Sequence, residues 1–241
     1  MRTVAVGVFC KTPAPGQSKT RLSPPLRPDE CAQLSACFIR DLAATIDEVA
    51  RGSAAVGYAV YTPVGTEDAL QQLLPPDFQL LPQCAGDFGI RLAASMRALL
   101  SRHAGAILVN SDSPTLPASI LRAAVDATLH GDAVVLSPAL DGGYTLIGLS
   151  TMHDELFVDM PWSTAQVYQR TVARCAEIGV PVVNVPGWYD VDDAASLALL
   201  MSEIAGERPP CAPSELDGAR APATRAHLAE RDAAVAADPA Q

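Results

Sequence analysis

Short apolar runs alternate along this chain with segments of helical periodicity, and this alternation limits the folds that the chain can adopt. The run at 3–10 (TVAVGVFC) is apolar throughout, as expected of a strand buried on both faces of a sheet. The segment 29–49 places apolar residues every three or four positions, which is typical of an amphipathic helix. Repeated alternation of this kind predicts an α/β fold with a mostly parallel sheet.

The alternation continues to residue 204. It predicts strands at 3–10, 55–62, 79–82, 105–110, 133–138, 143–149 and 180–185, and helices at 29–49, 66–74, 88–103, 117–129, 163–178 and 192–204. We expect the helix at 163–178 to begin with a capping box, because Ser163 and Gln166 have the spacing of that motif.

The 241 residues are enough for one large domain, and we expect that domain to span 1–206. The segment 207–241 contains 11 Ala and 5 Pro, no aromatic residue and few large aliphatic residues. Such a composition cannot build a core of its own. We expect a C-terminal extension that is helical or partly disordered and contributes little to folding.

Charge and hydropathy argue against two classes of protein. The chain has 27 acidic and 17 basic residues and a formal net charge of −10, which is unusual for a nucleic-acid-binding protein. No apolar run approaches the roughly 20 residues of a membrane span, and the first run lacks the features of a signal peptide. We expect a cytoplasmic protein that binds small molecules.

Positive charge is concentrated in the segment 9–22 (FCKTPAPGQSKTRL), which begins at the end of the first predicted strand. The chain has two lysines, Lys11 and Lys19, and both lie here with Arg21 and without an acidic residue. Ligands of open α/β sheets bind at this end of a strand, where Gly16 and the nearby prolines would shape an anion-binding loop. The segment predicts a phosphate site, and the alternative is a solvated basic loop.

Acidic residues follow several of the predicted strands. Asp112, in NSDSP, lies between a buried strand and a helix, where a carboxylate beside phosphates is a typical ligand of Mg²⁺. The alternative is that Asp112 caps the following turn. In WYDVD, Asp190 and Asp192 project to the same side if the chain is extended, which suits a divalent cation. Alternatively, Asp192 and Asp193 begin the last helix, and both interpretations can hold with different aspartates in each role.

The sequence Asp141-Gly142-Gly143 has two interpretations. Asp-Gly is a strong signal for a hairpin turn. The same glycines would also let the backbone approach a ligand closely, and both interpretations can hold. We therefore include all three residues among those expected to contact a nucleotide, together with Gly16.

Six segments, in this order, resemble a bacterial family of small transferases known as glycosyltransferase-like or selenodomain-associated transferases. They are FCKTPAPGQSKTRL (9–22), QCAGDFGIRL (83–92), NSDSPTLP (110–117), LDGGYTLIGL (140–149), PWST (161–164) and WYDVDDAASL (188–197). The family is similar in fold to the molybdenum-cofactor and phospholactate guanylyltransferases. The resemblance implies a GT-A, nucleotide-diphospho-sugar transferase type of fold: a Rossmann-like, three-layer α/β/α structure that binds a nucleotide with Mg²⁺ or Mn²⁺.

The resemblance also implies roles for individual residues. The implied ligand-binding residues are Lys11, Lys19 and Arg21 for the phosphates, Asp112 with Asp190 or Asp192 for the metal, and Asp87, Gly89 and Arg91 for the base or ribose. From this set, we expect Lys19, Arg21 and Asp112 to contribute directly to catalysis.

Three functions fit these residues. In nucleotidyl transfer, an acceptor phosphate attacks the α-phosphorus of a nucleoside triphosphate and pyrophosphate leaves; no strong base is needed, because the phosphate is already anionic near pH 7. In glycosyl transfer from a nucleotide sugar to a small-molecule acceptor, an inverting enzyme needs a carboxylate base for the acceptor hydroxyl, and Asp141 or Asp159 is the candidate. A non-catalytic module would bind nucleotides without turnover. We favour nucleotidyl transfer, since the motifs supply cations and metal ligands but no nucleophile–base pair.

Overall fold

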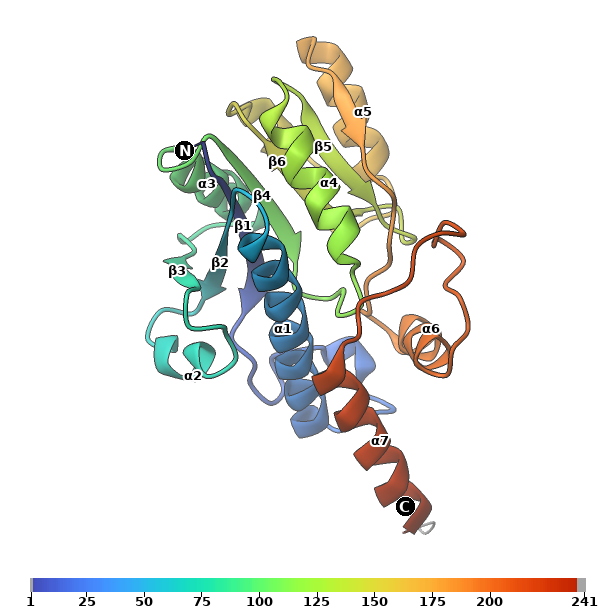
Figure 1. Cartoon of the computed structure of the whole chain (residues 1–241). Coiled ribbons are helices and arrows are strands. Elements are labelled where there is room, and N and C mark those ends of the chain that lie inside the picture. The colour runs from blue at the N-terminus through green and yellow to red at the C-terminus, as the bar shows by residue number, and fades with distance from the viewer. Residues whose placement is uncertain (1, 238–241) are drawn as a thin grey trace.

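A seven-stranded sheet with helices on both faces forms the centre of the computed structural model, which describes residues 2–237 (Figure 1). The strands are β1 (Val4–Lys11), β2 (Ala55–Thr62), β3 (Gln79–Pro82), β4 (Gly105–Asn110), β5 (Val134–Pro138), β6 (Tyr144–Leu149) and β7 (Val182–Asn184). Their order is β3-β2-β1-β4-β6-β5-β7, and only β6 runs antiparallel to its neighbours. The predicted mostly parallel sheet is confirmed.

Helices complete two further layers. They are α1 (Pro28–Arg51), α2 (Glu67–Gln71), α3 (Phe88–Leu100), α4 (Ala118–Leu129), α5 (Val167–Ile178), α6 (Ala194–Ile204) and α7 (Pro222–Ala237), with short 3-10 turns η1 (Thr20–Leu22) and η2 (Asp154–Phe157). Residues of α1, α4, α6 and α7 share one hydrophobic cluster, and those of α3 and α5 share another on the opposite face (Figure 1). This is the three-layer α/β/α arrangement that the resemblance implies.

The central strand β1 shows how the sequence produces these layers. Val4, Val6 and Val8 belong to the first cluster, whereas Ala5 belongs to the second, because successive side chains of a strand point to opposite faces. Each of these four side chains is buried. Both edges of β1 are paired in parallel, with β2 and β4, so the loop that follows Lys11 begins from a fixed point.

Helix α1 packs on the sheet through the apolar stripe that the sequence predicts. Leu34, Phe38, Leu42 and Ile46 are all fully buried. Pro28 occupies the first turn, where a missing N–H has no cost because that group has no partner within the helix.

Helix α5 begins later than predicted, so the expected capping box was wrong. Ser163 has a φ of 62°, in the left-handed region, and lies before the helix. Gln166 is the N-cap residue but makes no side-chain capping bond. The Thr164 hydroxyl instead donates to the Pro161 carbonyl at 2.7 Å and accepts the Gln166 N–H at 3.3 Å, which closes a separate turn.

The C-terminal segment packs against the domain. Leu228 of α7 is 3% exposed and belongs to the cluster that contains α1. Ala219 donates its N–H to the Thr115 carbonyl at 2.8 Å, and the Arg225 guanidinium donates to the Ile204 carbonyl at 2.9 Å. These contacts oppose the expectation that 207–241 contributes little to folding. None of the helices within 2–237 is long and apolar enough to cross a membrane.

Candidate functional site

A cavity of about 520 Å³ lies at the carboxyl ends of β1 and β4. Ligands of open α/β sheets bind at this edge, and the volume is within the range of small-molecule sites. Most of the predicted site residues line it, namely Lys11, Lys19, Arg21, Arg91, Asp112, Asp141, Gly143, Asp190 and Asp192. The remaining predicted residues do not line it; they are Gly16, Asp87, Gly89 and Gly142.

Lys19 joins two of the predicted metal ligands. Its ammonium nitrogen lies 2.7 Å from Asp112 Oδ1 and 2.9 Å from Asp192 Oδ1, and it donates to the Val191 carbonyl at 2.6 Å. The Lys19 side chain is only 5% exposed. Burial alone would lower the pKa of this ammonium, but the two carboxylates outweigh burial and raise it. Lys19 is therefore a charged group held between Asp112 and Asp192.

The loop after β1 has the conformation that this contact requires. Lys19 itself adopts a left-handed backbone, with φ of 49° and ψ of 40°. The loop is closed by hydrogen bonds from Gln17 and Ser18 N–H to the Ala14 carbonyl, and it is anchored by Leu22, which is fully buried. Left-handed conformations are unfavourable for lysine, so the tertiary contacts of the ammonium must stabilise this one.

Asp112 is not a helix cap. Pro117 is the N-cap residue of α4, and the Asp112 carboxylate accepts the Ser111 hydroxyl at 3.0 Å in addition to its bond with Lys19. The Asp112 carbonyl accepts the Val191 N–H at 2.8 Å. This bond ties the end of β4 to the segment that carries Asp192.

Asp190 lies among carboxylates. Its pKa is raised to about 7, mainly by burial and then by the negative charges of Asp141, Asp192 and Asp112. One lysine therefore does not offset the acidic charge on this side of the cavity. The antiparallel direction of β6 explains how Asp141 comes to be here: the start of β6 lies at the same edge of the sheet as the ends of β1 and β4.

The carboxylates provide a suitable donor set for a divalent cation. Carboxylate oxygens are the ligands that Mg²⁺ and Mn²⁺ prefer, and the surplus negative charge around Asp190 is what such a cation would offset. As arranged here, however, no three His, Cys, Asp or Glu side chains among the described residues are grouped as a metal site. The ammonium of Lys19 takes the position between Asp112 and Asp192.

The remaining cations of the cavity are available to an anion. Within residues 2–237, Lys11, Arg21 and Arg91 form no salt bridge. Lys11 is exposed at the end of β1, Arg21 is exposed in η1, and Arg91 is half-buried on α3. The cavity thus has cationic groups without acidic partners as well as a cluster of acids.

Aromatic rings surround Arg91. Its guanidinium lies 5.9 Å from the Phe9 ring and 5.8 Å from the Phe88 ring, and Nη1 donates to the Gln83 side-chain oxygen at 2.8 Å. The rings of Phe88 and Trp162 meet edge to face at 5.1 Å. Gln83, Phe9 and Phe88 have no role predicted from the sequence, although all three lie within the segments that carry the resemblance.

Asp87 and Gly89 lie outside the cavity and position helix α3, which carries Phe88 and Arg91. The Asp87 carboxylate accepts the Ile90 N–H at 2.9 Å and caps α3. A Cβ on Gly89 would lie 2.7 Å from both the Phe157 carbonyl and the Trp162 indole nitrogen. Glycine is therefore needed for α3 to pack against the segment that carries Trp162.

The turn before β6 has the geometry of the hairpin interpretation. The Asp141 carboxylate accepts the Gly143 N–H at 2.8 Å. Gly142 has a φ of 90°, and a Cβ there would lie 2.2 Å from the Ala165 carbonyl. The turn nevertheless brings Asp141 and Gly143 to the cavity wall, so the ligand interpretation also remains open.

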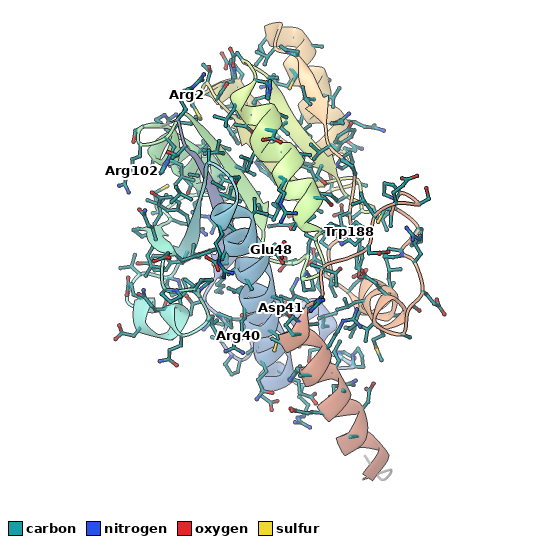
Figure 2. The ribbon with its side chains drawn as sticks, viewed as in Figure 1. Arg2, Arg40, Asp41, Glu48, Arg102 and Trp188 are labelled. Carbon is teal, nitrogen blue, oxygen red and sulfur yellow. The ribbon has the colours of Figure 1, made fainter. Side chains whose placement is uncertain are left out.

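A buried network holds the segment that carries Asp190. Trp188, which is labelled in Figure 2, is fully buried. Its backbone N–H donates to the Pro138 carbonyl at 3.0 Å, and its indole N–H donates to the Thr115 hydroxyl at 3.1 Å. The neighbouring Tyr189 donates its hydroxyl hydrogen to Glu203 of α6. Both aromatic side chains are therefore part of the core and do not form a wall of the cavity.

The acid next in sequence to Asp192 has a different role. Asp193 accepts the Ser196 N–H at 2.8 Å and forms the capping box of α6. Asp192 does not cap this helix, since its carboxylate contacts Lys19.

Comparison with known proteins gives a family match for the middle of the chain. Residues 45–164 match a family described as "Uncharacterized protein conserved in bacteria (DUF2064)". This segment belongs to the DUF2064 family. The DUF2064 segment includes Arg91, Asp112 and Asp141 and ends before Asp190.

Solved structures agree with the fold. A protein of Desulfovibrio desulfuricans G20, provisionally named a nucleotide-diphospho-sugar transferase, is 27% identical and aligns over 98% of each chain with a TM-score of 0.81. This likeness is consistent with the suspected transferase family and confirms the GT-A type of fold. Comparison with curated proteins gives no match.

Two more distant structures show the fold alone. A 4-diphosphocytidyl-2C-methyl-D-erythritol synthase is 9% identical and aligns over 83% of this chain and 97% of its own, with a TM-score of 0.54. A cytidylyltransferase of Leptospira borgpetersenii serovar Hardjo-bovis is 12% identical and aligns over 99% of this chain and 96% of its own, with a TM-score of 0.51.

Proposed function

We propose that this protein is a metal-dependent transferase that uses a nucleotide and transfers a nucleotidyl group from a nucleoside triphosphate to a phosphorylated acceptor. The observation that carries the proposal is the composition of the cavity wall. Three cations that form no salt bridge within residues 2–237, Lys11, Arg21 and Arg91, face the same space as the acids Asp112 and Asp190. Triphosphate and a divalent cation together would complement both groups.

The reaction forms a bond between an acceptor phosphate oxygen and the α-phosphorus of the donor, and it breaks the bond from the α-phosphorus to the oxygen of the leaving pyrophosphate. Lys11 and Arg21 would bind the phosphates and offset the charge that develops on pyrophosphate. The rings around Arg91 would provide a face for the nucleobase. These residues align the reactants, which is the main requirement for phosphoryl chemistry of this kind.

Asp112, Asp190 and Asp192 are the residues that would hold Mg²⁺ or Mn²⁺. When bound, the cation would supply charge neutralisation and orientation of the phosphate oxygens. No strong general base is required of the protein, because the acceptor phosphate is already ionised. The lining residues include no histidine, and burial raises the pKa of the one lining thiol, Cys10, to about 12, so it is not a thiolate nucleophile at neutral pH.

Glycosyl transfer from a nucleotide sugar is the second candidate. It is supported by the provisional name of the Desulfovibrio protein with which this chain shares 27% identity. Of the two bases considered for this reaction, Asp141 lines the cavity and Asp159 does not. The two reactions share a fold and a donor site but release different products.

Product analysis tests the proposal. The protein is incubated with Mg²⁺, each of four nucleoside triphosphates in turn, and a panel of sugar and alcohol phosphates; parallel reactions contain nucleotide sugars. We expect pyrophosphate to be released only when triphosphate and acceptor are both present. Release of a nucleoside diphosphate from a nucleotide sugar would instead establish glycosyl transfer. Binding of nucleotides without any product would indicate the non-catalytic module.

A further inference from the structure

Lys19 occupies the position in which a cation shared by Asp112 and Asp192 would lie. An ammonium group has three N–H donors, and Lys19 has three acceptors: Asp112 Oδ1 at 2.7 Å, Asp192 Oδ1 at 2.9 Å and the Val191 carbonyl at 2.6 Å. Its bonding capacity is therefore filled. In this arrangement Lys19 has no N–H left for a phosphate.

A divalent cation cannot join this arrangement without changing it. Mg²⁺ binds oxygen at about 2.0–2.1 Å, so each carboxylate oxygen would have to move inwards by about 0.6–0.9 Å from its distance to the ammonium. The metal and the Lys19 nitrogen would then compete for the same oxygens. The metal and the ammonium are both positively charged, so two such groups bound to the same oxygens of a partly buried site would also repel each other strongly.

We infer that Lys19 and the divalent cation exchange at the Asp112–Asp192 pair: the ammonium closes the site until the metal displaces it. This inference rests on the proposed function, in which the same carboxylates hold the metal. It means that Lys19 is a positioning residue for the acids and a competitor of the cation. It also predicts that the metal binds weakly to the protein alone.

The loop around Lys19 is suited to such an exchange. The ammonium is attached through a flexible four-carbon chain, and the backbone of Lys19 is in the unfavourable left-handed region. Gln17 and Thr20 beside it are exposed, and both line the cavity. A displaced Lys19 would therefore enter the space that the phosphates are proposed to fill.

Exchange of Lys19 with the metal would couple the binding of the metal to the binding of the nucleotide. Metal alone must break three charge-assisted or carbonyl hydrogen bonds of Lys19 without replacing them. A nucleotide supplies phosphate oxygens as new acceptors for the released ammonium. We therefore expect nucleotide to raise the affinity for metal, and metal to raise the affinity for nucleotide by the same factor, because coupling between two sites is reciprocal.

Manganese binding by variants provides the first test. Mn²⁺ is titrated into the full chain without nucleotide, and free Mn²⁺ is measured by electron paramagnetic resonance. We expect Lys19→Met to bind Mn²⁺ about tenfold or more tightly than the unmodified protein, since the competitor is removed. Lys11→Met is the matched control: it removes the other lysine of the same segment and is expected to change the affinity by no more than about twofold. The gain should be lost in the double variant Lys19→Met/Asp112→Asn.

The unmodified protein provides a second test, which does not depend on how the variants fold. The chain contains two lysines, so isotopically labelled lysine side chains give two resolved sets of NMR signals. Titration with Mg²⁺ alone should move the Lys19 signals towards those of an exposed lysine and leave the Lys11 signals nearly unchanged.

Two results would overturn the inference: Mn²⁺ affinity in Lys19→Met equal to or weaker than in the unmodified protein, or Lys19 signals that stay fixed while Mg²⁺ saturates the protein. These measurements contain neither donor nor acceptor. If the protein releases pyrophosphate but shows no exchange, the inference is wrong and the proposed function is retained. If exchange is observed but no product forms, the cation site is supported and the proposed reaction is wrong.

Discussion

The carboxylate of Asp41 accepts the backbone N–H of Thr224 at 2.8 Å, although the two residues are 183 positions apart in the chain. Its second oxygen accepts the Ala223 N–H at 3.0 Å, so a side chain from the middle of α1 caps the first turn of α7 (Figure 2). Asp41 is 3% exposed. Its buried charge is thus stabilised by backbone donors that belong to the C-terminal segment.

Replacing Asp41 should therefore weaken the whole fold. We expect Asp41→Ala to lower the free energy of unfolding by about 1–2 kcal/mol, the effect of losing a helix cap. Glu48→Ala on the same helix is the control, because Glu48 forms an exposed ion pair with Arg122 and such pairs contribute less than about 1 kcal/mol. Urea denaturation of both variants measures the difference, and equal effects would contradict the assigned role of Asp41.

Removal of the C-terminal segment should have a larger effect. A chain that ends at Gly206 loses Leu228 from the core and leaves Asp41 buried without its donors. We expect its melting temperature to fall by well over 5 °C, since a change of 1 kcal/mol shifts the melting temperature of a domain of this size by roughly 2–4 °C. Melting within a few degrees of the full chain would show that 207–241 is dispensable.

The elements of the sheet could be predicted from sequence because their signals are local. The strand at 105–110 is found with the predicted bounds, and the buried stripe of α1 follows directly from its apolar spacing. The start of α5 could not be predicted in this way. Ser163 and Gln166 have capping-box spacing, but the turn closed by Thr164 and Pro161 competes for the same backbone.

The sequence predicts which residues belong to the candidate site better than it predicts the contacts between them. Strand ends placed Lys19, Asp112 and Asp192 at one edge of the sheet, and all three line one cavity. That Lys19 bonds to the acids depends on its left-handed backbone and on a contact across 173 positions, neither of which has a local signal. The cap that Asp41 provides for α7 is likewise invisible in the pattern of α1.

The loop cations should contribute to phosphate affinity. We expect Arg21→Ala and Lys11→Ala each to weaken binding of a nucleoside triphosphate by about 1.5–3 kcal/mol, the scale of hydrogen bonds to charged groups. Arg51→Ala is the control, because this cation lies on the far end of α1 and forms an exposed ion pair with Asp47. Calorimetry with Mg²⁺ present measures all three affinities. Unchanged affinity in both loop variants would place the phosphates elsewhere.

The stability of the fold should depend on the ionisation of Glu203. Burial raises the pKa of this carboxyl above its ordinary value of 4.5, so the folded state retains the proton to higher pH than the unfolded state does. The free energy of unfolding therefore falls as pH rises from about 4.5 through the folded pKa. Glutamine cannot ionise, so we expect the free energy of unfolding of Glu203→Gln not to show this decrease. Its melting temperature relative to the unmodified protein should rise as the pH increases above about 4.5 and level off once the folded carboxyl of the unmodified protein has ionised; parallel profiles would contradict the assignment.

Asp112 provides the sharpest separation of catalytic and structural roles. Asp112→Asn keeps the shape of the side chain and the carbonyl that accepts the Val191 N–H, but it removes the charge beside Lys19. We expect pyrophosphate release to fall by about 10²-fold or more, because loss of one charged ligand impairs both alignment and charge stabilisation. The melting temperature measures separately the structural cost of weakening the ion pair with the nearly buried Lys19. Asp193→Asn is the matched control: asparagine also caps helices, and Asp193 lies next to the site but does not line it, so activity should be retained. Full activity in Asp112→Asn, with unchanged metal dependence, would move the reaction away from this carboxylate.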